Sequence, residues 1–286
     1  MVAFKIPCLV ALAFVLLNTV IAQDYPENNL SERTCFSWPE GMKMALSLTF
    51  DDARLSQADK GIPLLDRYNV KATFYVSPPS FKMRLDTWKK SAANGHEIGN
   101  HSLVHPCSGN FTFSRERALE DYTIEQMHAE LDSASRLLKY LVGTNPVSFA
   151  YPCGQTFIGR GINTRSYVPV VASLFQTGRG WLGEAPNDPA FCDLAQLTGM
   201  KLDGQTFEEI LVLIEGAKKS GHWLVLAGHE MGGEGNLVSC LETIEAICRY
   251  ASDPANGVWI DTVSNIASYI EENRKKEINK KSKKDG

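Results

Sequence analysis

The stretch ALSLTFDDARL, residues 45–55, starts as an apolar run and ends on charge. The run reaches Phe50, and two acids, Asp51 and Asp52, follow directly. Neighbouring side chains on a strand point to opposite faces, and a buried charge is costly unless something compensates it. We therefore expect a buried strand over residues 44–50 that stops at the two acids, because only there can both carboxylates enter one site.

Strand and helix patterns alternate along the rest of the sequence. Apolar, β-rich runs predict strands within residues 44–50, 70–76, 96–106, 146–154, 222–230 and 258–262. Periodic apolar patterns predict helices at residues 61–68, 86–95, 116–141, 205–221, 240–251 and 263–277. This alternation favours a parallel α/β architecture in one domain, in which functional residues collect at the carboxyl ends of the strands.

The N-terminal residues 1–22 indicate a secretory signal peptide. Lys5 precedes an apolar stretch over residues 6–17, and the sequence Val-Ile-Ala at residues 20–22 suits cleavage after Ala22. The apolar stretch is short for a membrane-spanning helix, and an uncleaved anchor is the alternative. We therefore expect a mature chain that is secreted or periplasmic and has no membrane span.

Composition and charge narrow the class of partner. The 286 residues are 44% hydrophobic and 22% charged, which is an ordinary balance for a globular domain with a substantial core. The net charge of -4 gives no reason to expect nucleic-acid binding. The basic residues do gather at the C-terminus, where residues 273–286 predict a solvated tail.

Six cysteines follow the predicted signal peptide, an even number that suggests disulfides in a secreted protein. They are Cys35, Cys107, Cys153, Cys192, Cys240 and Cys248. Their pairing does not follow from the sequence, apart from one exclusion. Cys240 and Cys248 lie on one predicted helix with a rise of about 12 Å between them, beyond the reach of a disulfide.

Two histidines stand four residues apart in the run HSLVH, at His101 and His105. On a helical turn this spacing brings both imidazoles to one face, where they can bind one metal ion. Surface or capping histidines are the alternative, because such spacing also arises by chance. Two neutral imidazoles with one carboxylate form a hydrolytic metal site, which would give the two adjacent acids separate tasks, one as a metal ligand and the other as a base.

His229 ends another apolar run, WLVLAGHE. At the end of a strand it can act as a general acid that protonates the leaving group. A histidine satisfied by the backbone is the alternative. The remaining three, His96, His128 and His222, have no comparable setting, and we interpret them as structural or exposed.

Four segments taken together resemble the polysaccharide deacetylases of the NodB-homology type, carbohydrate esterase family 4. They are LTFDD, GHEIGNHSLVHP, SFAYPCG and LVLAGHE, in this order within residues 44–270. The resemblance implies a distorted (β/α) barrel with mostly parallel strands. It also implies hydrolysis of an acetyl group from a sugar with a divalent metal ion, most often zinc, with cobalt, manganese or nickel as alternatives.

The resemblance gives each matching position a role. Asp51 would be the catalytic base and His229 the catalytic acid. The metal ligands would be Asp52, His101 and His105.

The third and fourth motifs add an oxyanion site and a pocket wall. The backbone N–H of Cys153 would help to hold the oxyanion, together with the metal. Trp181 and Tyr151 would line the substrate pocket.

The sequence departs from the family pattern at two positions. Ala150 stands where the family has an arginine that pairs with the base, and Gly180 stands where it has an aspartate beside a tryptophan. Residues elsewhere in the chain could replace them, and the alternative for the acid is that no residue orients His229. The candidates for the arginine are Arg54, Arg160 and Arg179, and those for the acid are Glu184, Asp188 and Asp193.

The predicted organisation is a signal peptide at 1–22, an extended arm at 23–43, a catalytic domain at 44–272 and a basic tail at 273–286. The predicted function is that of a secreted, metal-dependent deacetylase acting on an acetylated polysaccharide or oligosaccharide, at N-acetyl or O-acetyl groups. One alternative is a hydrolase of a non-sugar amide or imide with the same metal site. The other is a non-catalytic carbohydrate-binding relative, which the presence of all five core residues disfavours.

Overall fold

The computed structural model describes residues 36–282 of the chain. The predicted signal peptide, residues 23–35 of the predicted arm and residues 283–286 lie outside the described residues. None of the helices within residues 36–282 combines the length and the apolar character that a membrane crossing requires.

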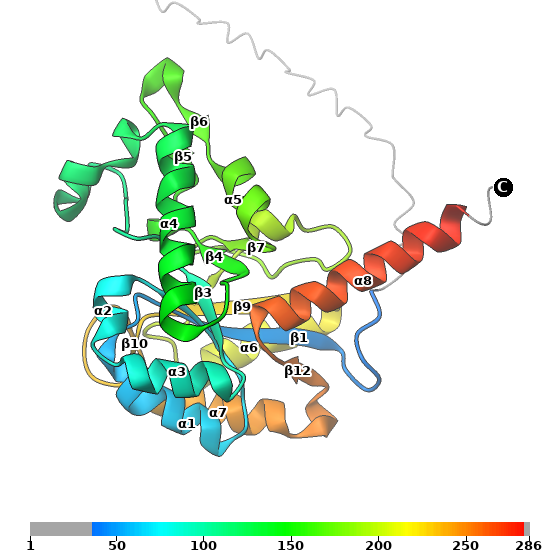
Figure 1. Cartoon of the computed structure of the whole chain (residues 1–286). Coiled ribbons are helices and arrows are strands. Elements are labelled where there is room, and N and C mark those ends of the chain that lie inside the picture. The colour runs from blue at the N-terminus through cyan, green and yellow to red at the C-terminus, as the bar shows by residue number, and fades with distance from the viewer. Residues whose placement is uncertain (1–35, 283–286) are drawn as a thin grey trace, which may run out of the picture. The chain divides into compact units, whose positions relative to one another are not determined.

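The centre of the fold is a sheet of eight parallel strands in the order β7-β4-β3-β2-β1-β9-β8, with β12 beside the first half of β1 (Figure 1). The strands span Met44–Asp51 (β1), Thr73–Val76 (β2), Glu97–Asn100 (β3), Ser148–Ala150 (β4), Thr177–Arg179 (β7), Met200–Lys201 (β8), Trp223–Gly228 (β9) and Val258–Ile260 (β12). Two small sheets pair β5 (Phe157–Ile158) with β6 (Arg165–Ser166) and β10 (Glu230–Met231) with β11 (Val238–Ser239). Each predicted strand region contains a strand of the main sheet, which confirms the parallel α/β prediction.

One segment closes this sheet into a distorted barrel. Leu197 forms a parallel bridge with Arg179 of β7, and its carbonyl accepts the N–H of Gly180 at 2.8 Å. Met200 then opens β8, which pairs with β9. β7 and β8 are the two edge strands of the sheet, so the segment from Leu197 to Lys201, which bridges to β7 and forms β8, joins the two edges. The expected distorted (β/α) barrel is thereby confirmed.

Alternate residues of β1 and β9 face two different layers, as the period of a strand requires. Met44 and Phe50 share an apolar cluster with α1, α3, α6 and α7, whereas Ala45 and Trp223 share a second cluster with α8. Figure 1 shows α1, α3 and α7 on one side of β1 and α8 on the other. Asp51 lies an even number of residues after Ala45, so its side chain is on the Ala45 face of β1, opposite to Phe50.

The helices span Ile62–Arg67 (α1), Pro78–Lys82 (α2), Leu85–Ala93 (α3), Ile124–Val142 (α4), Val168–Leu174 (α5), Phe207–Ser220 (α6), Leu241–Ser252 (α7) and Val263–Ser282 (α8).

Several helix boundaries differ from the predicted ones. α4 begins at Ile124 rather than near residue 116, because Thr123 and Gln126 form a capping box that fixes the helix start. The residues before it form two short 3₁₀ turns. At the other end of the chain, α8 continues to Ser282, into the stretch predicted as a solvated tail.

The described end of the predicted arm contacts the barrel. Trp38 is buried, and its indole N–H donates to the carbonyl of Gly221 at 2.8 Å. The ring of Trp38 also stacks on Tyr269 of α8 with 6.1 Å between ring centroids. Residues 36–43 therefore belong to the apolar layer on the α8 side of the sheet.

Candidate metal and catalytic site

A left-handed turn lets two neighbouring acids serve one site. Asp51 is the last residue of β1 and is 3% exposed. The next two residues, Asp52 and Ala53, have φ values of 75° and 53°. Non-glycine residues seldom adopt such values, which cost free energy and are common at functional sites. The turn ends the strand alternation, so the two carboxylates do not point to opposite faces.

The carboxylate of Asp52 faces two imidazoles that follow β3. Its Oδ1 lies 3.5 Å from Nε2 of His101 and 3.5 Å from Nε2 of His105. These distances exceed those of good N–H···O hydrogen bonds. They match the separation of about 3.3 Å between two ligand atoms of a tetrahedral zinc ion with bonds of about 2.0–2.1 Å. The three predicted ligands are therefore brought together with a spacing that fits a divalent metal ion.

Hydrogen bonds around these ligands fix their orientation. Nδ1 of His101 bonds to the carbonyl of Ala150 at 2.9 Å, which leaves Nε2 as the nitrogen that faces Asp52. Arg54 donates to Oδ2 of Asp52 at 2.8 and 3.1 Å, so that Oδ1 faces the imidazoles. Burial and the neighbouring His101 lower the pKa of His105 to about 4, which keeps its ring neutral at neutral pH.

Arg179 supplies the charge partner of Asp51. It reaches from the end of β7 to bond and ion-pair with the Asp51 carboxylate, and both side chains are buried. Its guanidinium also lies over the ring of Tyr75, 5.0 Å from the centroid. Burial alone would raise the pKa of Asp51, but Arg179 and two nearby histidines lower it below its usual value. Of the three arginines that the sequence offers in place of Ala150, Arg179 is the one beside Asp51.

The other two candidate arginines are engaged elsewhere. Arg54 pairs with Asp52, as described above, and Arg160 pairs with Asp121 at 2.8 Å. The interior position of Arg179 explains why it alone can reach Asp51.

The predicted partners of His229 are wrong, because a different acid takes that place. Asp203, two residues after β8, accepts from Nδ1 of His229 at 2.7 Å and from its backbone N–H at 3.0 Å. Ser239 also donates to this carboxylate at 2.7 Å. The candidate Asp193 instead caps a short 3₁₀ turn through Ala195 N–H. The pair of His229 and Asp203 leaves Nε2 of the histidine to exchange a proton.

Carboxylates nearby set the charge of His229. Burial by itself lowers the pKa of His229, but the hydrogen bond that its ring donates to Asp203 and the charge of Asp51 raise this pKa above its usual value. The indole of Trp181 stands edge-on to the imidazole, with 4.9 Å between ring centroids. Gln57 joins the two strand ends, since its amide donates to the carbonyls of Asp51 at 2.6 Å and His229 at 2.8 Å.

A disulfide links the loop of the predicted ligands to the predicted oxyanion turn. It joins Cys107 to Cys153, and Sγ of Cys107 lies 3.6 Å from Nδ1 of His105. Cys153 has a φ of 55°. The next residue, Gly154, packs so close to Trp181 that a Cβ on this glycine would lie 2.8 Å from the Trp181 side chain. The disulfide therefore links the turn at Cys153, the predicted oxyanion turn, to the loop that carries the predicted metal ligand His105. The described part of the chain has three free thiols, at Cys192, Cys240 and Cys248, so it contains no bond between Cys240 and Cys248. Cys35 lies outside the described residues.

Tyr151 does not line a pocket wall, so this prediction is wrong. Its side chain is 1% exposed, packs against Phe149 and Tyr167, and donates from its hydroxyl to the carbonyl of Ala195 at 2.7 Å. A tyrosine in a strand-to-turn segment can satisfy its hydroxyl inside the core, and the motif alone does not distinguish this from a pocket position.

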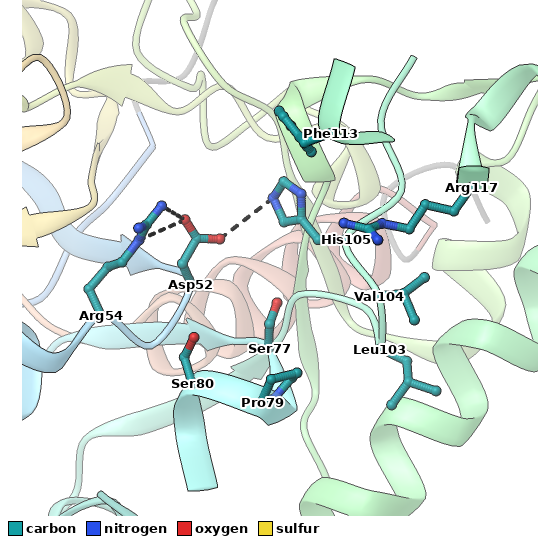
Figure 2. Close-up of a pocket in the computed structure, with 10 residues that line it drawn as sticks. All are labelled: Asp52, Arg54, Ser77, Pro79, Ser80, Leu103, Val104, His105, Phe113 and Arg117. Atoms are coloured by element: carbon teal, nitrogen blue, oxygen red, sulfur yellow. Dashed lines mark hydrogen bonds and ion pairs between the residues drawn. The ribbon is translucent and has the colours of Figure 1, made fainter. Parts of the chain in front are cut away.

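A pocket of about 510 Å³ opens beside the predicted metal ligands (Figure 2). Asp52 and His105 form part of its wall. Figure 2 shows Ser77, Pro79 and Ser80 on one side and Arg117 approaching from the other. The pocket therefore gives a ligand direct access to Asp52 and His105.

The fold and the site define the class of this protein as a NodB-type barrel. Residues 40–165 match the sequence model of the polysaccharide deacetylase family. The peptidoglycan-N-acetylglucosamine deacetylase PgdA of Listeria monocytogenes is 40% identical over 62 residues, which are 21% of this chain and 13% of that protein. The uncharacterized protein YlxY of Bacillus subtilis is 32% identical over 97 residues, 34% of this chain and 27% of that protein.

Solved structures agree with this assignment at the level of the fold. The peptidoglycan deacetylase PdaC of Bacillus subtilis has a TM-score of 0.52 and 16% identity, covering 85% of this chain and 98% of that chain. Residues 40–165 are therefore similar in sequence to the polysaccharide deacetylase family, and the described barrel shares its fold with PdaC. It spans less than a third of the length of either sequence relative.

Proposed function

We propose that this protein is a secreted, metal-dependent deacetylase that removes acetyl groups from a polysaccharide or oligosaccharide. The observation that carries the proposal is the separation of two adjacent acids. Asp52 faces His101 and His105, whereas Asp51 is held by Arg179. The family match over residues 40–165 and the deacetylase activity named for PgdA support an N-acetyl substrate, with O-acetyl groups as the second possibility.

Asp52, His101 and His105 would hold the metal ion. Two nitrogen ligands and one oxygen ligand suit zinc, and the same set accepts cobalt, manganese or nickel. When bound, such an ion polarises a carbonyl and makes a nearby water more acidic.

The chain's own groups then account for the movement of protons. Asp51, held ionised by Arg179, takes a proton from the attacking water. The N–H of Cys153 faces the oxygen that becomes negative when the water oxygen bonds to the acetyl carbon. His229 gives its Nε2 proton to the leaving nitrogen or oxygen as the bond to the acetyl carbon breaks, and acetate is released.

The predicted signal peptide and the disulfide support an extracellular setting for this reaction. Disulfides persist in oxidising compartments, and the bond between Cys107 and Cys153 lies at the site itself. An acetylated polysaccharide outside the cell would be the substrate.

Metal binding tests the proposal directly. We expect the chain to bind one zinc ion and to release acetate, and a chelator to abolish release until metal is restored. His105→Ala should lose both the bound zinc and the activity. His128→Ala, which changes an exposed histidine of α4, should keep both. Metal content by mass spectrometry and acetate by an enzymatic assay give the two readouts.

The substrates in that assay separate the competing functions. Acetylated chito-oligomers, acetylated xylan, peptidoglycan and small cyclic amides are compared. Hydrolysis of the cyclic amides alone would replace the proposal with a non-sugar amidase. A chain that binds metal and glycan but releases no acetate would be a carbohydrate-binding relative.

Loss of the disulfide should weaken both activity and stability. The double variant Cys107→Ser and Cys153→Ser is expected to lower kcat/KM about tenfold, because the His105 loop and the Cys153 turn lose their common anchor. It should also lower the free energy of unfolding by about 2–4 kcal/mol, since the bond closes a long loop. Acetate release and urea unfolding measure these effects. Cys240→Ser, at an exposed thiol, is the control and should change neither.

A further inference from the structure

We propose that Arg117 makes this site selective for glycans that carry a carboxylate next to the acetylated sugar. The inference rests on the proposed deacetylase function and adds the chemical class of its substrate. Arg117 ends the 3₁₀ helix Thr112–Arg117, outside the motifs that define the family site.

Arg117 shares a pocket with the predicted metal ligands. It lines the same pocket of about 510 Å³ as Asp52 and His105. In Figure 2 its side chain extends from its helix toward the side of the pocket where His105 lies, between Phe113 and Val104. A sugar with its acetyl group at Asp52 and His105 would therefore bring a neighbouring substituent to the guanidinium.

The guanidinium of Arg117 is a free positive charge. It is exposed, and no salt bridge or side-chain hydrogen bond of Arg117 exists within residues 36–282. The pocket contains one other arginine, Arg54, but this side chain is already bound to Asp52. Asp52 is the one carboxylate of the pocket lining, so Arg117 remains uncompensated there.

Nearby acids belong to a neighbouring hollow, and two of the three have partners of their own. That hollow includes Arg117 together with Glu116, Asp121 and Glu130. Asp121 pairs with Arg160, and Glu130 accepts the N–H groups of the loop at residues 103–104. On the pocket side, the guanidinium faces no competing carboxylate other than Asp52.

Aromatic surface beside Arg117 suits the ring of a sugar. Phe113 is 56% exposed and Phe111 is 42% exposed, with 5.5 Å between their ring centroids. Phe113 also lies 6.3 Å from the ring of His105. Exposed apolar groups that gather at a polar pocket mark ligand-binding surfaces. A sugar ring over Phe113 would place its carboxylate within reach of Arg117, where a charge-assisted and bidentate hydrogen bond can form.

The test compares one oligosaccharide in two forms. In the first, carboxylate-bearing sugars alternate with N-acetylated sugars; in the second, each carboxylate is reduced to an alcohol. The wild-type chain is expected to favour the carboxylate form about tenfold in kcat/KM, mainly through KM, because the contact persists from ground state to transition state. The preference should shrink as the salt concentration rises.

Variants of two neighbouring arginines make the test specific. Arg117→Gln should abolish the preference, and Arg117→Glu should reverse it. Arg115→Gln is the matched control, because Arg115 is exposed, contacts the carbonyl of Gly109 and does not line the pocket. Calorimetric titration of both oligosaccharides gives the affinities independently of hydrolysis.

The outcomes separate this inference from the proposed function. If both forms are hydrolysed equally, or if Arg117→Gln keeps the preference, the role of Arg117 is wrong and the deacetylase stands. If neither form is hydrolysed but the carboxylate form binds more tightly through Arg117, the deacetylase is wrong and the recognition stands. Equal binding and no hydrolysis would overturn both.

Discussion

Replacing Arg179 with methionine is expected to lower kcat/KM for acetate release by about 10²- to 10⁴-fold. The variant keeps most of the side-chain volume but leaves the Asp51 carboxylate buried without its partner. Burial then dominates and favours the protonated carboxyl group, which cannot accept a proton from water. The same change should reduce the free energy of unfolding by about 3–5 kcal/mol, as expected when one member of a buried ion pair is removed.

A second substitution separates the two effects of Arg179. The double variant Asp51→Asn and Arg179→Met removes both charges and should recover much of the lost stability, but no activity. Arg136→Met is the control, because Arg136 forms an exposed pair with Asp132 that contributes little. Urea unfolding and acetate release are measured on all variants. Activity within a few-fold of wild type in Arg179→Met would show that Asp51 needs no charge partner.

Replacing Asp203 with asparagine is expected to reduce kcat/KM by about 10²-fold or more at neutral and alkaline pH. A general acid must be protonated, so activity falls as the pH rises through the pKa of His229. Asp203 raises that pKa against the effect of burial, so its loss lowers the pKa. The alkaline limb of the profile should therefore move to lower pH. The variant also loses the acceptor that holds Nδ1 of His229.

The choice of leaving group tests this explanation. A nitrophenyl acetate ester has a leaving group that needs no proton, so Asp203→Asn should hydrolyse it at nearly the wild-type rate. Arg179→Met should be slow on both substrates, because the attacking water still needs a base. Asp193→Asn is the matched control and should leave the pH profile unchanged, since Asp193 caps a short turn away from His229. An unshifted alkaline limb in Asp203→Asn would remove His229 from the role of acid.

The strands that could be predicted lie in apolar or β-rich runs, and the two that were missed do not. β1 is a mostly apolar stretch of eight residues that ends on Asp51, and β9 is an apolar run of six residues that ends just before His229. Such runs are recognisable without any knowledge of the fold. β7 and β8 have three and two residues, and nearby glycines (Gly178, Gly180 and Gly199) interrupt the surrounding sequence.

The partners of the base and the acid lie at the ends of these short strands. Arg179 could be proposed only as one of three arginines, because its pairing depends on the closure of the barrel. Asp203 carried a weak signal that was missed: Met200 and Leu202 alternate with Lys201 and an acid follows, as at the end of a strand. A single alternation of this kind is too common to identify a site without the fold.

The segment from Leu197 to Lys201, which joins β7 to β9, also sets an order of assembly. Asp52, His101 and His105 follow β1 and β3 and do not depend on that segment. Arg179 precedes this segment and Asp203 follows it. Closure of the barrel therefore brings Arg179 to Asp51 and Asp203 to His229 in the same step. We therefore expect that a folding chain can gather its predicted metal ligands before the barrel closes, and that hydrolysis becomes possible only after closure.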